Sequence, residues 1–523
     1  MFKGNFIKGV LIDMKNPRSN TLAKAGIITG ISLFLGLLFD YFFYGKIPGI
    51  SFPFYVVLVI AGLFVISYFF KKQISKEVLW LLALLIFFSA MVFIRSSFLL
   101  IFLNVVASLL LLLVITEVSF GEKVKNFLIE DYIKIFFLPF MFICPLFQTL
   151  SNLFSQRGVN KDRKVFSQIA KGVLMAFPVL FVFLLLFSSA DLIFQKHVLN
   201  LINIDNELEI IFRFILILIA TLVYIGAYTY SFREKEGKIT VQQNSKNHTL
   251  GHIESSILLG SVNVLFFIFM LVQLTYLFGG ESNISAQGFT YAEYARRGFF
   301  ELIAVAIISL LLLLTIEKYV IKKETEHALG FKIFSTALVV QVILIITSAF
   351  TRLSLYEKAY GFTTLRLYSH VFIILLAVIF CLLLYKIYRD KREHTFAFRV
   401  FLSIALFLAV MNFLNPDAYI ARRNIERFDA TGKLDIYYLS HLSDDAIPDT
   451  IKVLNLSNDD LRKSFARELY WRTQNSDSPY FLQWQSLNIS RMRAYKILNS
   501  KIRDFETYKD YQQQKFDPVE HYE

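Results

Sequence analysis

The chain has few charged residues and few cysteines for its length. Only 18% of its 523 residues are charged, and 56% are hydrophobic. A soluble globular protein has about 25% charged residues, so this composition does not fit a soluble fold. The two cysteines, Cys144 and Cys381, both lie inside apolar stretches, where we expect buried thiols and no disulfide.

Familiar reaction signatures are also absent from the sequence. It holds no HExxH motif, no GxSxG motif, no P-loop and no GxGxxG fingerprint. His248 and His252 have the i,i+4 spacing of metal ligands, but no third ligand accompanies them at a motif spacing. We therefore expect no metal and no cofactor. The missing motifs argue against common hydrolases, zinc proteases and ATP-driven pumps and favour a protein that is not an enzyme, but they leave open a membrane enzyme with unfamiliar residues.

Apolar runs long enough to cross a membrane recur from residue 25 to residue 414. A membrane-spanning helix needs about 20 mostly apolar residues. A further apolar stretch at 133–154 is interrupted by Pro139 and Pro145, each of which removes a backbone donor, so we expect an interfacial or re-entrant helix there. The predicted fold class is all-α, a polytopic membrane bundle with about eleven spans, at residues 25–44, 53–70, 78–94, 97–116, 172–190, 210–230, 254–278, 298–317, 333–351, 367–386 and 396–414.

The positions of lysine and arginine orient these spans. If the N-terminus is inside and 133–154 does not cross, the inside segments carry 28 lysines and arginines and the outside loops carry eight. Basic loops usually stay in the cytoplasm. We therefore expect a multi-pass protein of the cytoplasmic membrane with a cytoplasmic N-terminus and an extracytoplasmic C-terminus.

Changes in composition divide the chain into four segments. We predict a cytoplasmic segment at 1–24, a transmembrane domain at 25–414, a small extracytoplasmic helical domain at 415–510 and a frayed tail at 511–523. After Phe428 the chain has 13 basic and 15 acidic residues. The tail is therefore not a nucleic-acid-binding arm, and we expect no nucleic-acid partner.

Polar residues are concentrated in the loops assigned to the outside. Before the eighth span, Thr290 and Glu293 form a capping box that starts a new helix. On that helix Arg297 is four residues from both Glu293 and Glu301, which predicts ion pairs. At the start of the tenth span, Arg366 is four residues before His370.

The outer end of the eleventh span carries the densest group of charges. Asn415 suits a helix N-cap, Pro416 suits the first helical position, and a new helix should begin there in a different direction. On this helix Arg422 is expected to pair with Glu426. Arg423 and Arg427 repel each other at the same spacing, so at least one arginine should find a partner elsewhere, such as Glu293, Glu301 or Glu357.

We predict that these loops form one composite outward-facing site. Guanidinium groups bind phosphate or carboxylate through two parallel hydrogen bonds, so the ligand would be an anion or a lipid headgroup. The alternative is that the charges only cap helices and pair with each other. The candidate residues are Tyr291, Glu293, Tyr294, Arg296, Arg297, Glu301, Arg352, Tyr356, Glu357, Arg366, His370, Asp417, Arg422, Arg423, Glu426 and Arg427.

Four strings in these loops carry a resemblance to a known family. They read YLFGG, TYAEYARRGFFEL, LYEKAYGFTTLRLY and NPDAYIARRNIERF. Over residues 170–450 the chain resembles bacterial multi-pass membrane proteins catalogued as domain of unknown function 4173. The resemblance implies a protein of the bacterial inner membrane and supplies no catalytic residues.

Three functions fit these patterns. The first is a non-enzymatic envelope protein that binds an anionic lipid, another anionic ligand or an envelope protein at the outer site, with the lipid bilayer as its surroundings. The second is a transporter of a small or anionic solute, which needs polar residues near the midplane, such as Asn104, Asn263 and Gln341. The third is a membrane enzyme acting on lipid-linked substrates, with Glu293, Glu301 or His370 as acid or base.

Overall fold

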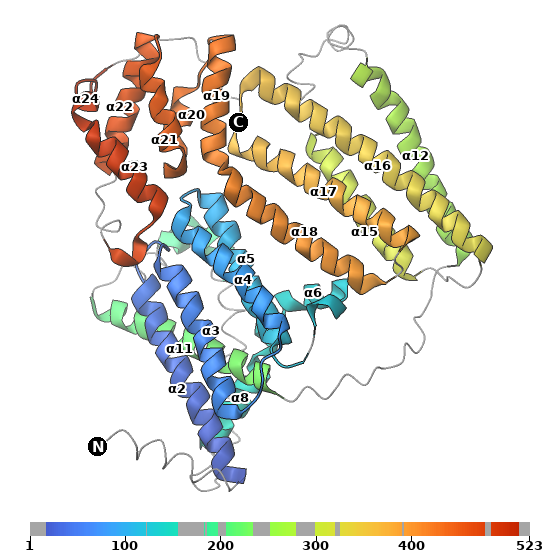
Figure 1. Ribbon diagram of the computed structural model, residues 1–523, viewed down its shortest axis with the longest axis vertical. Helices are drawn as coiled ribbons and strands as arrows, with labels where there is room; N and C mark the ends of the chain where they lie inside the picture. The colour runs from blue at the N-terminus through green and yellow to red at the C-terminus, as the bar shows by residue number, and fades with distance from the viewer. Residues whose placement is uncertain are drawn as a thin grey trace.

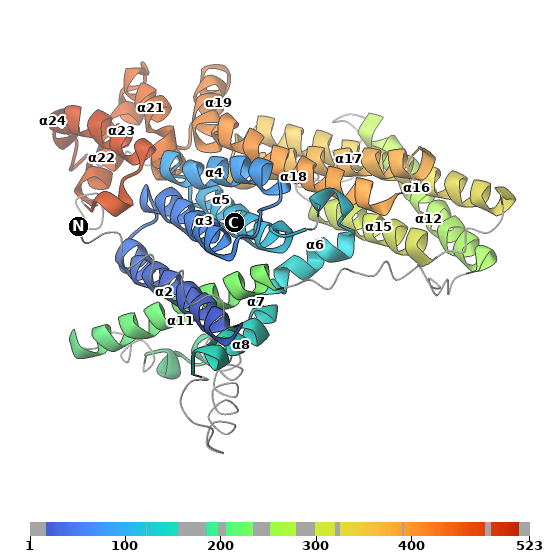
Figure 2. The ribbon, with the colours of Figure 1, turned by 60° about the horizontal axis from the view of Figure 1, so that its bottom comes forward.

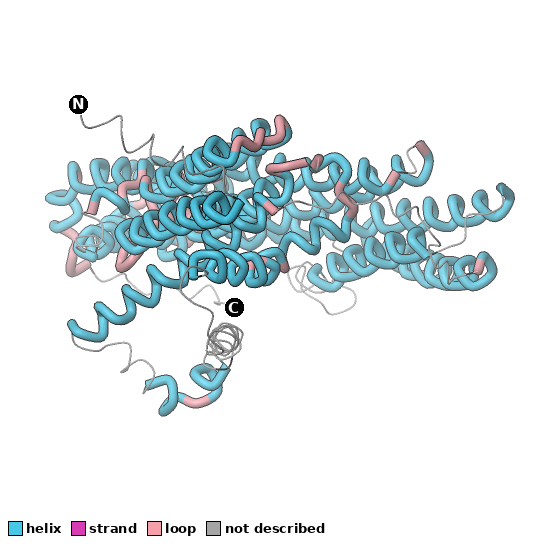
Figure 3. The backbone as a smooth tube through the Cα atoms, turned by 90° about the horizontal axis from the view of Figure 1, so that it is seen from below, coloured by secondary structure: helices cyan, strands magenta, loops and turns pink. Residues whose placement is uncertain are grey.

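The computed structural model describes residues 17–121, 123–154, 183, 186–196, 206–233, 251–278, 299–319, 325–389, 392–475 and 483–511. Within these ranges every regular element is a helix and no strand occurs (Figures 1 and 3). The predicted all-α fold is therefore confirmed.

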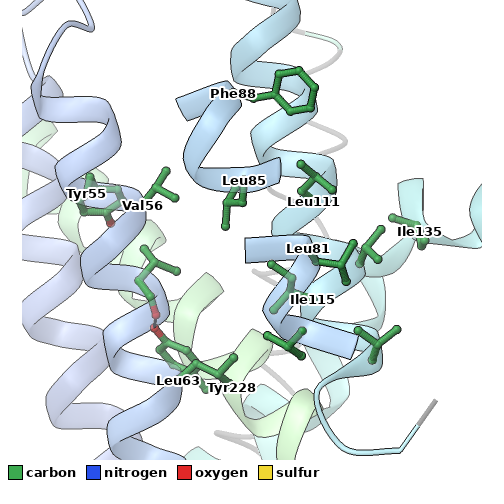
Figure 4. Close-up of a cluster of buried hydrophobic side chains, with 14 of the residues drawn as sticks. Tyr55, Val56, Leu63, Leu81, Leu85, Phe88, Leu111, Ile115, Ile135 and Tyr228 are labelled. Carbon is green, nitrogen blue, oxygen red and sulfur yellow. Dashed lines mark hydrogen bonds between the residues drawn. The ribbon is translucent and has the colours of Figure 1, made fainter. Parts of the chain in front are cut away.

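One group of helices is formed by the N-terminal half of the chain. It consists of α2 (Pro17–Phe43), α3 (Ser51–Phe70), α4 (Glu77–Ile94), α5 (Phe98–Val118) and α11 (Asn206–Phe232). Side chains such as Leu63, Leu81 and Leu111 fill the space between these helices (Figure 4). Gly36 lets α2 approach α11 closely, since a Cβ there would lie 2.8 Å from Ile217 O.

A second group follows in the chain and has its own core. It consists of α12 (His252–Phe278), α15 (Phe299–Tyr319), α16 (Thr325–Tyr360) and α17 (Thr364–Tyr388), packed around residues such as Leu338 and Phe380. The next helix, α18 (Glu393–Leu414), packs against α17 on one side and against α4 and α5 on the other (Figures 1 and 2). It therefore joins the two groups.

Ten of the described helices are long and apolar enough to cross a membrane. They correspond to ten of the eleven predicted spans, and the chain is a multi-pass integral membrane protein. The remaining predicted span, 172–190, lies mostly outside the described residues, although residues 186–190 are helical.

The interrupted apolar stretch forms short helices in place of one straight span. These are α6 (Ile129–Phe136), α7 (Leu138–Met141) and α8 (Ile143–Phe154). The chain bends by 70° between Ile129–Phe136 and Leu138–Leu153, as a broken span or a re-entrant loop does. Pro139, near the start of α7, lies at this bend.

The two cysteines differ from the prediction in one respect. Cys144 and Cys381 are free thiols, but both are exposed at the protein surface and not buried. An apolar residue of a membrane protein can face lipid, so apolar surroundings in the sequence do not imply a place in the protein core.

The C-terminal part of the chain folds into a bundle of short helices at one end of the membrane helices (Figure 1). Its core contains Ile420, Leu439, Phe465, Leu469 and Phe505. We call this bundle the tail domain. It comprises α19 (Pro416–Thr431), α20 (Ile436–His441), η3 (Asp444–Ala446), α21 (Ile447–Thr450), η4 (Ile451–Asn455), α22 (Asp459–Asn475), η6 (Trp484–Ser486), α23 (Ile489–Ser500) and α24 (Ile502–Glu506).

The segment boundaries predicted at the two ends fall partly on undescribed residues. Residues 1–16 and 512–523 lie outside the described part of the chain. Helix α2 already begins at Pro17, eight residues before the predicted start of the first span, so the last part of the predicted segment 1–24 is helical.

Candidate functional site

The turn between α16 and α17 is held by an asparagine of the tail domain. Asn424 of α19 accepts from the Phe362 amide at 2.7 Å and donates to the Phe362 carbonyl at 2.8 Å. Gly361 has a φ of +85°, and a Cβ there would lie 2.8 Å from Asn424 Oδ1. Glycine is therefore needed both for the left-handed backbone and for the close approach of Asn424.

Two arginines satisfy carbonyl groups at the end of α16. Arg427 of α19 donates to Lys358 O at 2.9 Å and also to Ala359 O, while Arg366 of α17 donates to Gly361 O at 2.6 Å. The last carbonyls of a helix have no partner within the helix and attract cations. Burial, and secondarily the charge of Arg366, lowers the pKa of Arg427. The Arg427 guanidinium group therefore fastens the tail domain to α16, whereas Arg366 stabilises the turn between α16 and α17.

Three side chains of α16 and α17 form a continuous chain of hydrogen bonds, which begins about one helical turn before Gly361. Nδ1 of His370 lies 3.0 Å from Glu357 Oε1, and Nε2 lies 3.2 Å from Ser354 Oγ. Glu357 is 4% exposed and His370 is 9% exposed. The partner of His370 is therefore Glu357 on the neighbouring helix. We call these three residues the Ser354–His370–Glu357 chain.

A buried aspartate of the tail domain binds the loop between α4 and α5. Oδ2 of Asp445 accepts from the amides of Ser96 and Ser97 at 2.6 and 2.9 Å, and Oδ1 accepts from Ser490 Oγ at 2.5 Å. Arg95 Nη1 is 3.7 Å from the same carboxylate. The tail domain is thus fixed to the first group of helices as well as to the second. We call this contact the Asp445 latch.

Asp417, a second buried carboxylate, lies close to the latch. Its Oδ2 accepts from the Ser443 amide at 3.3 Å, and no hydrogen-bond partner for Oδ1 exists among the described residues. Burial raises the pKa of Asp417 above 3.8, bonds with Ser443 lower it, and the nearby charge of Asp445 raises it further. Asp417 therefore holds its proton more tightly than an exposed aspartate does.

The start of α19 agrees only partly with the prediction. Pro416 occupies the first helical position as expected. Asn415 stands at the N-cap position, but its φ is +53° and its side chain makes no cap hydrogen bond. The left-handed residue produces the change of direction between α18 and α19, which the sequence assigned to the proline.

The other charged residues of α19 mostly bind within the tail domain. Arg423 pairs with Glu426 at 3.1 Å, whereas the sequence predicted Arg422 as the partner of Glu426. Arg422 lies 3.6 Å from Asp449. A long side chain reaches i+3 as readily as i+4, and residues on other elements compete for it.

The remaining candidate residues divide into described and undescribed ones. Glu301 is exposed in the first turn of α15, Arg352 is 6% exposed, and the guanidinium of Arg366 lies 4.0 Å from the ring centre of Tyr356. Ligand binding by these residues stays a prediction. The candidates that lie outside the described residues are Tyr291, Glu293, Tyr294, Arg296 and Arg297.

The polar residues expected near the midplane bind across helices. Asn104 and Asn412 bind each other, and Gln341 donates to the carbonyl of Asn263 at 3.2 Å. In the described part of the chain no group of three or more histidines, cysteines, aspartates or glutamates is placed to hold a metal ion.

A groove that sequence reasoning did not identify runs between α16, α17 and α18. It has a volume of about 760 Å³. Helix α17 lines it with the stripe Ile374, Val378, Cys381 and Tyr385, and His370 continues this stripe four residues earlier. The spacing of the stripe is visible in the sequence, but it also fits a face that contacts lipid. The full lining is Ile346, Thr347, Phe350, Ile373, Ile374, Ala377, Val378, Cys381, Leu382, Tyr385 and Arg399.

The groove is apolar along its length and charged at one end. Arg399 of α18 lies with its guanidinium 4.5 Å from the ring centre of Tyr385. At the opposite end the ring of Phe350 lies 4.4 Å from the imidazole of His370. The groove thus connects a cationic end with the Ser354–His370–Glu357 chain.

Comparison with protein families matches residues 78–453 to the domain of unknown function DUF4153. No curated protein and no solved structure matches the chain. The resemblance to domain of unknown function 4173 is therefore wrong. Polar, tyrosine-rich and arginine-rich strings between apolar spans reflect physics that membrane proteins share, so they do not separate one family from another.

Proposed function

The chain belongs to the DUF4153 family, and since this family is defined by a domain of unknown function, we propose a function from the geometry. We propose that the protein binds an anionic phospholipid in the groove between α16, α17 and α18, with the lipid phosphate at Arg399. The observation that carries this proposal is an apolar groove whose charged lining residue lies at one end.

The dimensions of the groove suit one lipid chain. From Ile373 to Tyr385, helix α17 rises by about 18 Å at ~1.5 Å per residue. One leaflet occupies about half of a hydrocarbon core of ~30 Å. A chain that enters beside Tyr385 would therefore reach the midplane of the bilayer within the groove.

The charged end suits a phosphate. A guanidinium group donates two parallel hydrogen bonds to phosphate oxygens, and tyrosine favours the level of the headgroups. Tyr385 is 47% exposed, so the region around it is open to a headgroup. Arg399 lies six residues into α18, or about 9 Å from its start, within reach of the membrane interface.

The basic loops support an orientation for this site. With the N-terminus in the cytoplasm and the tail domain outside, Arg399 would face the inner leaflet, whose anionic lipids attract basic residues. We therefore propose a lipid-binding role in a cytoplasmic membrane. The bacterial origin of that membrane stays a prediction.

Native mass spectrometry of the full-length protein released from detergent micelles tests the proposal. Phosphatidylglycerol is the probe lipid, added over a range of concentrations. We expect Arg399→Ala to weaken binding about tenfold or more, because it removes the charged hydrogen bonds to the phosphate. Arg389→Ala is the matched control, since it removes an exposed arginine at the same end of the bundle but outside the groove lining.

A second pair of variants tests the groove itself. Ala377→Phe fills the groove, whereas Val340→Phe adds bulk on an exposed position of α16 that does not line it. We expect only the first to displace phosphatidylglycerol. Equal affinities for the wild type, Arg399→Ala and Ala377→Phe would overturn the proposal.

A further inference from the structure

The Ser354–His370–Glu357 chain has the connectivity of a nucleophile, a base and an orienting carboxylate. Ser354 and Glu357 are three residues apart on one face of α16, and His370 of α17 lies between them. The imidazole contacts Glu357 through Nδ1 at 3.0 Å and Ser354 through Nε2 at 3.2 Å. Both distances lie within or at the edge of the reach expected for nucleophile and base in a protein without substrate.

The two ring nitrogens of His370 have different roles as hydrogen-bond donor and acceptor. An ionised carboxylate can only accept hydrogen bonds, so in the reactive state that we propose, with Glu357 ionised, Nδ1 of His370 carries the proton that faces Glu357. Nε2 then carries the lone pair and faces two oxygens, Ser354 Oγ at 3.2 Å and Phe350 O at 3.4 Å. This is the tautomer in which a histidine can remove the proton of a serine hydroxyl.

The ordinary alternative is a structural hydrogen bond between α16 and α17. Ser354 Oγ donates to Phe350 O at 3.0 Å, and such bonds to the carbonyl four residues earlier are common for serine in helices. A hydroxyl has one proton, so the Ser354 O–H must turn from Phe350 O to His370 Nε2 before the proton can be transferred. Ser403 and Ser309 make the same bond, at 2.9 and 2.7 Å. The additional bond to His370 Nε2 distinguishes Ser354 from these two serines.

The position of Ser354 makes its hydroxyl accessible from the lipid phase. It lies one helical turn beyond Phe350, which lines the groove, and its side chain is only partly buried. It is also six residues before the end of α16, about 9 Å from the end of the helix that contacts the tail domain. A lipid ester in the leaflet at this end of the bundle would lie at a similar depth.

We propose that Ser354 is an acyl-transfer nucleophile for a carboxylic ester of a membrane lipid. Ser354 Oγ would attack the carbonyl carbon while its proton moves to His370 Nε2. The bond to the alcohol oxygen then breaks, and His370 returns the proton to the leaving alcohol. Water or a second alcohol, deprotonated by His370, takes the acyl group from Ser354 and restores the hydroxyl. Glu357 acts as a positioning residue that holds the tautomer and stabilises the imidazolium.

A fluorophosphonate probe on the solubilised full-length protein tests this proposal. Such probes react with activated serines, and mass spectrometry of the digested protein identifies the modified residue. We expect a covalent adduct on Ser354, no adduct there in Ser354→Ala, and labelling at least 100-fold slower in His370→Gln, because the general base is lost. Ser403→Ala is the matched control and should leave labelling of Ser354 unchanged.

The role of Glu357 needs a measurement that a structural effect would not reproduce. We expect Glu357→Gln to slow labelling and Glu357→Asp to restore part of the rate, when both variants show the same thermal unfolding. Hydrolysis of a fluorogenic long-chain acyl ester in micelles should follow the same order.

The outcome does not depend on the lipid site at Arg399. Labelling of Ser354 is measured without added phosphatidylglycerol, and lipid binding is measured without the probe, so failure of the phospholipid proposal and failure of this one are distinguishable. Arg389→Ala, which lies outside the groove lining, should leave the labelling rate unchanged. Absence of an adduct on Ser354 in folded wild-type protein would overturn the inference without any variant. An unchanged labelling rate in a folded His370→Gln protein would overturn it as well.

Discussion

Asn104 of α5 and Asn412 of α18 bind each other through both halves of their amide groups. Each Nδ2 donates to the Oδ1 of the other residue at 2.8 Å, and both side chains are fully buried. The residues are 308 positions apart in the chain. This pair fixes the register of α18, the helix that joins the two helix groups, against the first group.

Removing one member of the pair should destabilise the protein. In Asn104→Ala the amide of Asn412 loses a donor and an acceptor, so we expect a loss of about 1–2 kcal/mol in the free energy of unfolding. Denaturant unfolding in micelles measures this loss. Asn104→Leu combined with Asn412→Leu should cost less than the sum of the single changes. Asn499→Ala, on an exposed face of α23, is the control, and strict additivity would contradict the prediction.

The Asp445 latch should govern how tightly the tail domain is held. Asp445→Ala removes the acceptor for the amides of Ser96 and Ser97, and we expect a loss of about 3 kcal/mol. Limited proteolysis and hydrogen exchange of residues 415–511 should both become faster. Glu426→Ala removes an exposed ion pair with Arg423, and a loss below about 0.5 kcal/mol is expected there. Equal effects of the two changes would speak against the latch.

Asp417 should make stability depend on pH. Its pKa is raised in the folded protein, mainly by burial, so the folded state binds the proton more tightly than the unfolded state does. Its contribution to the free energy of unfolding therefore falls as pH rises from about 3.8 through the folded-state pKa. Asp417→Asn removes the charge, and we expect it to be more stable than the wild type at pH 7, by a margin that shrinks towards pH 4. Thermal unfolding of both proteins over this range measures the margin, and a margin that grows towards acid pH would refute the assignment.

The turn after α16 should not tolerate a side chain at Gly361. Alanine there must adopt a φ of +85° and would press against Asn424, so we expect Gly361→Ala to cost about 2 kcal/mol. Gly30→Ala is the matched control, because a Cβ at Gly30 meets open space inside α2. That change should be neutral or stabilising by up to about 1 kcal/mol. Thermal unfolding compares the two variants.

Hydropathy predicted most of the membrane architecture correctly because burial in lipid is a local property of a segment. Ten predicted spans coincide with helices long enough to cross, and the stretch containing Pro139 is bent by 70°. That this stretch does not cross the membrane stays a prediction. Each of these features depends on consecutive residues alone.

The partners of the polar residues could not be predicted in the same way. Reasoning from i,i+4 spacing considers one helix at a time, but Glu357 meets His370 on another helix, and Arg427 binds carbonyl oxygens of α16. Every residue of the chain offers a backbone carbonyl, so the sequence does not indicate which one an arginine will bind. The groove could not be predicted from the sequence for a related reason, because its lining residues come from three different helices.

The Asp445 latch has a consequence for how the chain is assembled. Ser96 and its carboxylate partner are separated by 349 positions, and synthesis proceeds from the N-terminus. The loop between α4 and α5 is therefore synthesised long before Asp445. The amides of Ser96 and Ser97 can bind this carboxylate only after the tail domain has been made. A chain that stops at the end of α18 would leave the amides of Ser96 and Ser97 without this carboxylate, so the contact between the tail domain and the first group of helices can form only late in synthesis.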